Sequence, residues 1–189
     1  MAAPKHIQIL AFVGLPGSGK STAVEYFSKN GYPKVYFGGV VLEAMREEGI
    51  EITPENEKVF REELREKHGK DVIVTRIAEQ IQNLIDAGQK RIIADGLYTW
   101  TEYKILKKAF PQELTVAAIV APRRVRYRRL AERPIRPLTA TEAYDRDTSE
   151  IENLEKGGPI AIADHYITNK SSVDELYVKL AELQEELGF

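Results

Sequence analysis

The sequence predicts an α/β fold in which a five-stranded parallel sheet carries helices on both faces. The first observation behind this prediction is an apolar run from Ile7 to Val13 that leads directly into the glycine-rich segment Gly14–Ser21. The second is that further apolar runs alternate with amphipathic segments of helix length, which is typical of a parallel sheet covered on both sides. The apolar runs end at Val13, Phe37, Asp95, Val120 and Ile167.

The segment Gly14–Ser21 reads Gly-Leu-Pro-Gly-Ser-Gly-Lys-Ser and has the spacing of a phosphate-binding loop. Glycines allow successive backbone N–H groups to turn inward around an anion, and the following helix adds the positive end of its dipole. Lys20 then reaches the outer phosphates, and the Ser21 hydroxyl is a ligand for Mg²⁺. We therefore expect a P-loop NTPase fold that binds a nucleoside triphosphate. The expected phosphate-binding residues are Gly14, Pro16, Gly17, Ser18, Gly19, Lys20, Ser21 and Thr22.

The residues on either side of this loop have the pattern that the motif requires. Alternating apolar residues from Ile7 to Val13 predict a buried strand before the loop. The range Lys20–Lys29 predicts a helix after it, with Ala23, Val24 and Phe27 on one face.

Later helix starts are marked by capping residues. Thr53 precedes Pro54, and proline is favoured at the first helical position. Three Ser/Thr-x-x-Glu patterns predict capping boxes, in which the two residues bond reciprocally through side chain and backbone. These patterns are Thr99–Glu102, Thr139–Glu142 and Ser172–Glu175. The last opens an expected C-terminal helix with one apolar face formed by Val173, Leu176, Leu180, Leu183 and Leu187.

We expect residues 1–189 to form a single domain with two helical insertions. One insertion covers about residues 38–84 and has no convincing strand, and the other covers about residues 123–158 and begins with many arginines. In an enzyme that transfers a phosphoryl group, these would be the acceptor-binding part and the lid. Both would move to keep water from the reaction.

The composition sets further bounds. The 189 residues include no cysteine and carry a formal net charge of −2, which excludes disulfides, thiolate metal sites and a global attraction to nucleic acid or membranes. No apolar run approaches the ~20 residues that span a bilayer, and the N-terminus lacks a signal-peptide pattern. We therefore expect a cytoplasmic protein without a membrane or nucleic-acid partner. The sequence leaves the oligomeric state open.

Several segments, taken in order, resemble those of dephospho-CoA kinases. They are Gly14–Ser21, Ile92–Gly96, the arginines Arg126, Arg129 and Arg133, the pair Arg146-Asp147, and Ala163–Asn169. The chain is also similar to a family related to adenylate kinases, which has stretches like Thr53–Asn56 and Arg65–Gly69. The resemblance covers nearly the whole length and implies a small P-loop kinase that uses ATP and Mg²⁺.

Asp95 ends an apolar run and precedes Gly96, so its carboxylate is expected at the carboxyl edge of the sheet. Ligands of open α/β folds bind at this edge. The resemblance implies that Asp95 holds Mg²⁺, directly or through water, together with Ser21. The alternative interpretation is a turn-forming Asp-Gly pair.

Seven arginines and one glutamate lie between Arg123 and Arg136. Arg126, Arg129 and Arg133 are spaced three and four residues apart, so we expect them on one face of a helix. Planar guanidinium groups suit a triphosphate, because they stabilise the charge that develops on the transferring oxygens. The resemblance assigns this stretch to the lid, with Arg129 and Arg133 as catalytic residues and Arg126 as an ATP contact. A solvated basic face and an RNA-binding patch are the alternatives.

The expected acceptor site departs from the pattern of dephospho-CoA kinases. Those enzymes have an aspartate that takes a proton from the acceptor hydroxyl, whereas this chain has Gly38 and Gly39 at the matching positions. A phosphate acceptor is already anionic and needs positive charge more than a base, so this departure favours a phosphate acceptor. Arg65 and Arg76 are candidates for that charge, and Tyr98 is a candidate to stack on an acceptor base. Solvated charges and core packing are the alternatives.

Taken together, these patterns predict a phosphotransferase that moves the γ-phosphoryl group of ATP, with Mg²⁺, to a nucleotide-like small molecule. In the families that the chain resembles, the loop around Asn169 lies close to the adenine, which makes Asn169 a candidate base contact. Its alternative role is a strand end and helix cap. The alternative function is a regulatory module that binds or hydrolyses a nucleoside triphosphate without kinase activity.

Overall fold

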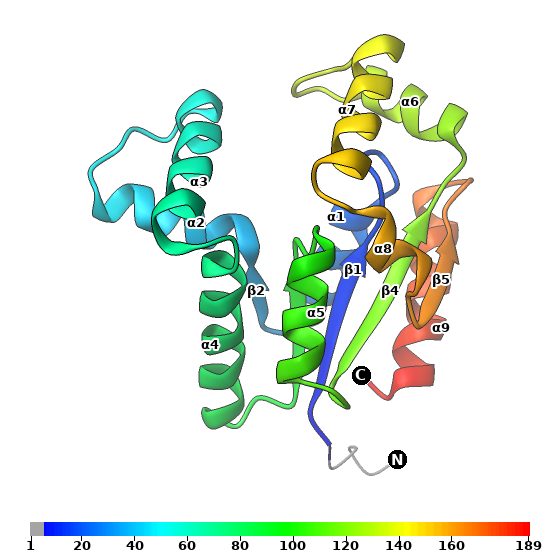
Figure 1. The fold of residues 1–189 in the computed structure, drawn as a ribbon. Helices are drawn as coiled ribbons and strands as arrows, with labels where there is room; N and C mark the ends of the chain where they lie inside the picture. Colours follow the sequence, from blue (N-terminus) through cyan, green and yellow to red (C-terminus); the bar gives the residue numbers. More distant parts are fainter. Residues whose placement is uncertain (1–5) are drawn as a thin grey trace.

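The computed structural model describes residues 6–189, and at positions 54, 55 and 58 it describes the backbone alone. At its centre is a sheet formed by β1 Gln8–Val13, β2 Lys34–Tyr36, β3 Arg91–Asp95, β4 Leu114–Val120 and β5 His165–Thr168. The strands lie in the order β2-β3-β1-β4-β5, and every neighbouring pair is parallel. This architecture confirms the predicted α/β fold with a five-stranded parallel sheet (Figure 1).

Helices cover both faces of the sheet, as predicted (Figure 1). They are α1 Lys20–Lys29, α2 Phe37–Glu47, α3 Pro54–His68, α4 Val72–Asp86, α5 Trp100–Ala109, α6 Arg123–Glu132, α7 Ala140–Glu152, α8 Gly157–Ala161 and α9 Val173–Leu187. Side chains of α1 and α9 share a hydrophobic cluster with one face of the sheet. Side chains of α2 to α5 share a second cluster with the other face.

The central strand β1 is buried on both faces. Ile9, Ala11 and Val13 belong to the cluster under α2 to α5, whereas Leu10 and Phe12 belong to the cluster under α1 and α9. All five side chains are at most 1% exposed. A strand covered on both sides needs no polar face, which explains the unbroken apolar run.

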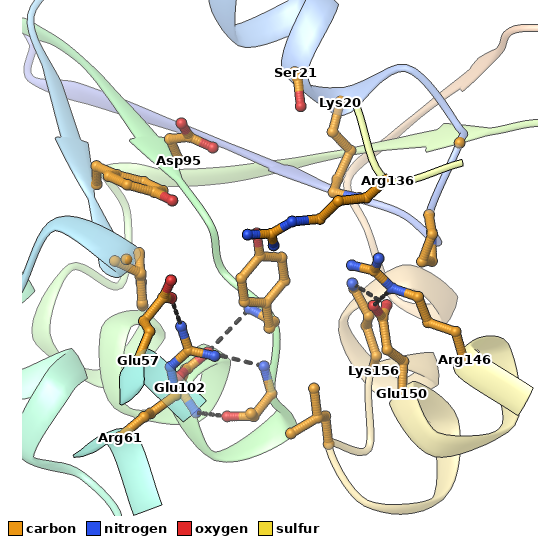
Figure 2. Close-up of a pocket in the computed structure, with 18 of the residues that line it drawn as sticks. Lys20, Ser21, Glu57, Arg61, Asp95, Glu102, Arg136, Arg146, Glu150 and Lys156 are labelled. Atoms are coloured by element: carbon orange, nitrogen blue, oxygen red, sulfur yellow. Dashed lines mark hydrogen bonds and ion pairs between the residues drawn. The ribbon is translucent and has the colours of Figure 1, made fainter. Parts of the chain in front are cut away.

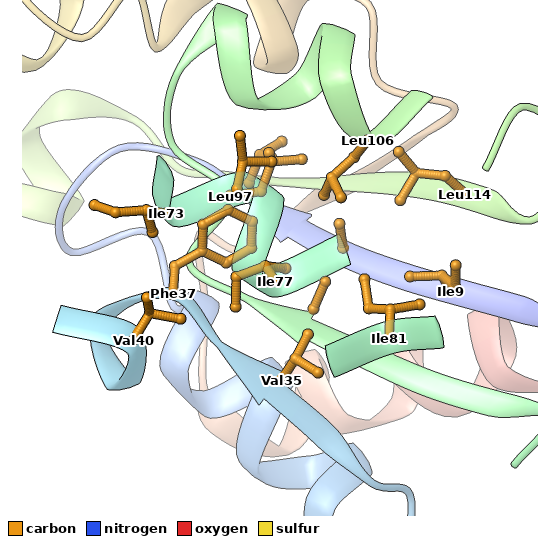
Figure 3. Close-up of a cluster of buried hydrophobic side chains, with 14 of the residues drawn as sticks. Ile9, Val35, Phe37, Val40, Ile73, Ile77, Ile81, Leu97, Leu106 and Leu114 are labelled. Atoms are coloured by element: carbon orange, nitrogen blue, oxygen red, sulfur yellow. The ribbon is translucent and has the colours of Figure 1, made fainter. Parts of the chain in front are cut away.

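The cluster under α2 to α5 fixes the elements beside the functional site (Figure 3). Ile73, Ile77 and Ile81 are spaced four residues apart along α4 and face the sheet, where Val35 of β2 belongs to the same cluster. Phe37, the first residue of α2, joins them. Burying one such side chain contributes roughly 1.5–3 kcal/mol, so this cluster holds α2 and α4 firmly against the strand ends.

The two expected helical insertions are helical in the structure. Residues 37–86 contain α2, α3 and α4, and residues 123–158 contain α6, α7 and the start of α8. The second strand ends at Tyr36 rather than at Phe37, because Phe37 already begins α2. Within the described part of the chain, no helix is long and apolar enough to cross a membrane.

Two of the three expected capping boxes form completely, at Thr99–Glu102 and Thr139–Glu142. The third prediction was wrong in part: Ser172 accepts a bond from the Glu175 backbone N–H, but the reciprocal bond is not among those formed at this helix start. Val173 was also placed on the apolar face and is instead 53% exposed. The core contacts of α9 begin only at Leu176, so its first turn extends beyond the buried cluster.

Candidate active site

The predicted phosphate-binding loop connects β1 to α1 at the carboxyl edge of the sheet. The strand order reverses at β1, which lies between β3 and β4, and open α/β folds bind ligands at such a position. Gly14, Gly17 and Gly19 have φ angles of +146°, +75° and +105°, which glycine adopts without strain. The first turn of α1 has no acidic residue, so the positive end of its dipole remains available to an anion.

Gly14→Ala is expected to weaken ATP binding by about tenfold or more, because the loop must shift to admit a methyl group. Gly14 has a φ of +146°, and a Cβ atom added there would overlap the carbonyl oxygen of Ile119. Gly31→Ala is the matched control, since Gly31 has a φ of +87° but nothing within 4 Å of an added Cβ. Calorimetric titration with Mg-ATP makes the comparison, and equal affinities in the two variants would contradict the prediction.

Lys20 is the first residue of α1, and its side chain lies folded over the loop. Its Nζ donates to the carbonyl oxygens of Gly14 at 2.6 Å and Leu15 at 3.5 Å. Burial, and then the nearby charge of Lys156, lower the pKa of Lys20 to about 7. The loop therefore holds an ammonium group in a position that disfavours its charge, and a bound phosphate would reverse that effect.

A cavity of about 740 Å³ opens beside the loop. Its lining includes Pro16, Gly17, Gly19, Lys20 and Ser21 of the loop, but not Gly14, Ser18 or Thr22. The cationic side chains that line it are Lys20, Arg61, Arg65, Arg129, Arg133, Arg136, Arg146 and Lys156, and the acidic ones are Glu57, Asp95, Glu102 and Glu150. This excess of positive charge suits a polyanionic ligand.

The cavity has two sides below the loop (Figure 2). Glu57 and Arg61 come from α3 and lie on one side. Arg65 of the same helix also lines the cavity. Arg146 of α7 lies on the other side. The helical segments on both sides of the sheet edge therefore contribute to one continuous cavity.

Asp95 ends β3 and lies in register with Phe12 of β1 and Tyr36 of β2. Burial raises the pKa of this carboxyl group. The positive charges of Lys34, 3.8 Å away, and of Lys20 oppose that rise. A carboxylate and the Ser21 hydroxyl are hard oxygen donors of the kind that Mg²⁺ prefers. This pair of donors fits a metal that takes its other ligands from phosphate and water. The described residues contain no group of three or more His, Cys, Asp or Glu placed to hold a metal.

The structure does not bring Arg126 to the cavity, in contrast to its predicted contact with ATP. Its guanidinium is 5% exposed and forms two bonds to the Asp147 carboxylate, at 2.9 and 2.6 Å. It also donates to the carbonyl oxygen of Pro16 at 3.0 Å. Arg126 belongs to α6 and Asp147 to α7. Through these bonds Arg126 connects the two helices to the phosphate-binding loop.

Arg129 and Asn169 form a second support for the loop. Arg129 lines the cavity but donates to the backbone oxygens of Asn169 at 3.1 Å and Ser171 at 2.9 Å. Asn169 is buried, does not line the cavity, and donates to the carbonyl oxygen of Ser18 at 2.8 Å. The Asn169 amide thus supports the loop from beneath, and its contact with adenine stays a prediction.

The remaining predicted residues divide into those inside and those outside the cavity. Arg133 lines it but lies beyond the end of α6, in extended backbone, so the expected row of three arginines on one helix face was wrong. Arg65 and Tyr98 line it as well, and Arg65 lies 3.6 Å from the Glu102 carboxylate. Arg76 of α4 does not line the cavity.

The structure also explains the two glycines at the expected acceptor position. A Cβ atom added to Gly38 would overlap the phenol ring of Tyr36, which lines the cavity there. The space of the missing side chain is thus filled by an aromatic residue from two positions earlier. Burial, and then the charge of Asp95, raise the pKa of the Tyr36 phenol.

Among the cavity residues that were not selected as site residues from the sequence are Arg136, Arg146, Glu150 and Lys156. Arg146 belongs to the Arg146-Asp147 pair that resembles dephospho-CoA kinases, and its spacing of four residues from Glu150 is typical of solvated helix surfaces. Lys156 lies in a short turn that carries no pattern. Only the folded arrangement of α7 and α8 brings these side chains to the phosphate-binding loop.

The family model described as AAA domain matches residues 10–153. A UPF0200 protein of Thermococcus kodakarensis is 32% identical over 182 residues, which covers 95% of this chain and 97% of that protein. Among solved structures, a shikimate kinase from Bacteroides thetaiotaomicron superposes with a TM-score of 0.60 at 14% identity and covers 96% of this chain and 99% of its own. A gluconokinase from Sinorhizobium meliloti gives a TM-score of 0.55 at 16% identity, with 97% of both chains covered.

At these identities the two kinases show the fold of this chain and no more. The match to an AAA domain supports nucleotide binding. The family match and the full-length relative agree with the predicted P-loop kinase superfamily. The chain therefore belongs to the UPF0200 family, within the P-loop kinase superfamily, and contains its AAA domain at residues 10–153.

Proposed function

We propose that this protein is a kinase that transfers the γ-phosphoryl group of ATP, with Mg²⁺, to a nucleotide-like small molecule. The observation that carries the proposal is the continuous cavity, in which the loop residues Lys20 and Ser21 lie between cationic side chains of the α6–α7 region and cationic and aromatic side chains of α3 and β3–α5. Such a cavity has room for a donor beside the loop and an acceptor next to it.

Transfer of a phosphoryl group requires positioning and charge stabilisation more than covalent participation of the protein. In the proposed reaction, the loop and Lys20 hold the phosphates, and Ser21 and Asp95 hold the metal. Arg129 and Arg133, at the rim of the cavity, offset the charge that develops on the transferring oxygens. Arg126 and Asn169 keep the loop in shape from behind.

The acceptor that fits this cavity best already carries negative charge. Every acidic side chain that lines the cavity has a cationic partner: Glu57 with Arg61, Asp95 with Lys34, Glu102 with Arg65, and Glu150 with Lys156. Carboxylates held in this way are poor general bases, and an acceptor phosphate needs none. The charges of Arg61 and Arg65 therefore support a nucleoside monophosphate over an acceptor that reacts through a hydroxyl group.

The decisive experiment incubates the protein with Mg-ATP and a pool of nucleoside monophosphates, deoxynucleotides and dephospho-CoA. We expect mass spectrometry to find a nucleoside monophosphate that has gained one phosphoryl group, together with ADP. Phosphorylated dephospho-CoA would instead indicate an acceptor hydroxyl. ADP without any phosphorylated acceptor would contradict the kinase proposal.

A regulatory nucleotide-binding module is the second candidate, and one observation favours it. Gly38 and Gly39 stand where dephospho-CoA kinases, which the chain resembles, place the aspartate that takes a proton from the acceptor hydroxyl. A module of this kind would consume ATP at a rate that no member of the acceptor pool increases, whereas a kinase would consume it faster with its acceptor present.

A further inference from the structure

Lys156 is a buried cation inside the candidate site. It lies directly before α8, and only 2% of its surface is exposed. Its Nζ donates to the Glu150 carboxylate and lies 4.4 Å from the centre of the Tyr98 ring. Two residues further on, Gly158 lies so close to the ring of Trp100 that an added Cβ atom would overlap it.

The surroundings of Lys156 hold more positive charge than one carboxylate balances. Glu150 accepts from Lys156 and, at 3.2 Å, from the Nε of Arg146. Lys20 of the phosphate-binding loop is close enough that the charge of Lys156 contributes to the lowering of its pKa. Three cations from α1, α7 and the start of α8 thus converge around one acidic group in the cavity (Figure 2).

This arrangement is a costly way to stabilise a fold. A buried ion pair often stabilises a fold no more than apolar residues of the same volume do. Here the pair of Lys156 and Glu150 also has the positive charges of Arg146 and Lys20 nearby. Burial lowers the pKa of Lys156, and Glu150 only opposes that shift. A polyanion placed between Lys20 and Lys156 would relieve the repulsion.

We propose that Lys156 is a catalytic residue that binds the γ-phosphoryl group of ATP during its transfer, and that Glu150 is the residue that positions it. The inference rests on the proposed function. The bond between the γ-phosphorus and the β,γ-bridging oxygen breaks, its electron pair stays on ADP, and the acceptor oxygen forms the new bond. Lys156 donates hydrogen bonds to the non-bridging γ-oxygens throughout and gives up no proton.

Lys156 approaches the site from the side opposite to α3. Its ammonium lies over Tyr98, which lines the cavity close to the side chains proposed to bind the acceptor. Lys20 is attached to the loop on the donor side. A phosphoryl group that moves from donor to acceptor would therefore lie between Lys20 on the donor side and Lys156 on the acceptor side.

The test compares the affinities of ATP and ADP, because only ATP carries the γ-phosphoryl group. Lys156→Gln is expected to weaken the binding of Mg-ATP by about tenfold or more while the binding of Mg-ADP changes less than about twofold. Lys156→Arg is expected to restore part of the difference. Lys108→Gln, an exposed residue of α5, is the control for the loss of a lysine charge. Calorimetric titration of the wild type and the three variants with Mg-ATP and with Mg-ADP gives the eight affinities that the comparison needs.

A merely structural Lys156 would give a different result. Its substitution would lower the melting temperature and weaken ATP and ADP equally, which would overturn the inference. Glu150→Gln provides a second test, in which the lysine at position 156 is retained. Without a competing carboxylate, ATP is expected to bind as tightly as before or more tightly, whereas kcat for transfer falls because Lys156 is less well oriented. An unchanged kcat would overturn the positioning role of Glu150.

Failure of the proposed function gives a distinct pattern. If the wild-type protein binds neither ATP nor ADP, both the kinase proposal and the role of Lys156 are wrong. If the wild-type protein binds both nucleotides and the Lys156→Gln variant keeps the same ratio of affinities, only the role of Lys156 is wrong.

Discussion

Replacing Lys20 by alanine is expected to reduce phosphoryl transfer by about 10²–10³-fold while the protein remains folded. Lys20 is the loop lysine of the cavity, and its ammonium is held within 2.6 Å of the Gly14 carbonyl oxygen, at the mouth of the loop. A neutral methyl group cannot attract the outer phosphates or offset charge that develops during transfer. Since the ammonium is buried among other cations, its removal is expected to leave the melting temperature unchanged or higher.

Lys29→Ala is the matched control, because Lys29 lies on the same helix and pairs with exposed Glu25 at 2.7 Å. Rates of acceptor phosphorylation and thermal melting, measured on both variants, separate a loss of chemistry from a loss of structure. Transfer by the Lys20→Ala variant at a rate within a few-fold of the wild type would rule out the proposed mechanism.

The largest loss of stability is expected from Arg126→Met. The substitution leaves the Asp147 carboxylate buried without its bidentate partner, and breaking such a pair from one side costs about 3–5 kcal/mol. For a chain of this size, the melting temperature is expected to fall on the order of 10 °C. The Pro16 carbonyl oxygen loses its donor at the same time, so nucleotide binding is also expected to weaken.

Urea denaturation of this variant and of Arg128→Met measures the effect, since Arg128 is an exposed neighbour on α6. The double variant Arg126→Met with Asp147→Leu is expected to recover most of the lost free energy of unfolding, because it removes the unpaired Asp147 carboxylate. If Arg126→Met were no less stable than Arg128→Met, the pair would contribute nothing to the fold.

Much of the fold was predictable because its signals are local. The strand, loop and helix between residues 8 and 29 are specified by adjacent residues: an apolar run, glycines with positive φ, and a helix start. The boxes at Thr99 and Thr139 likewise involve residues three positions apart. The parallel sheet follows from the alternation of such units.

The roles of individual charged residues were less predictable, because they depend on partners that are distant in the sequence. Spacing alone placed Arg126 beside Arg129 and Arg133, but Asp147, 21 positions away, holds Arg126 away from the cavity. Lys156 had no motif around it and enters the site through the packing of α8. Asn169 had a plausible ligand role, yet its amide donates to the carbonyl oxygen of Ser18, 151 positions earlier.

The bond between Asn169 and Ser18 has a consequence for how the protein is made. The loop at residues 14–21 leaves the ribosome before the residues around Asn169, whose amide holds the Ser18 carbonyl oxygen from 151 positions later in the sequence. Until those residues emerge, the loop lacks a support that the finished protein has. We therefore expect nucleotide to protect only chains that extend past Asn169, so that shortened products of interrupted translation gain no such protection from proteolysis.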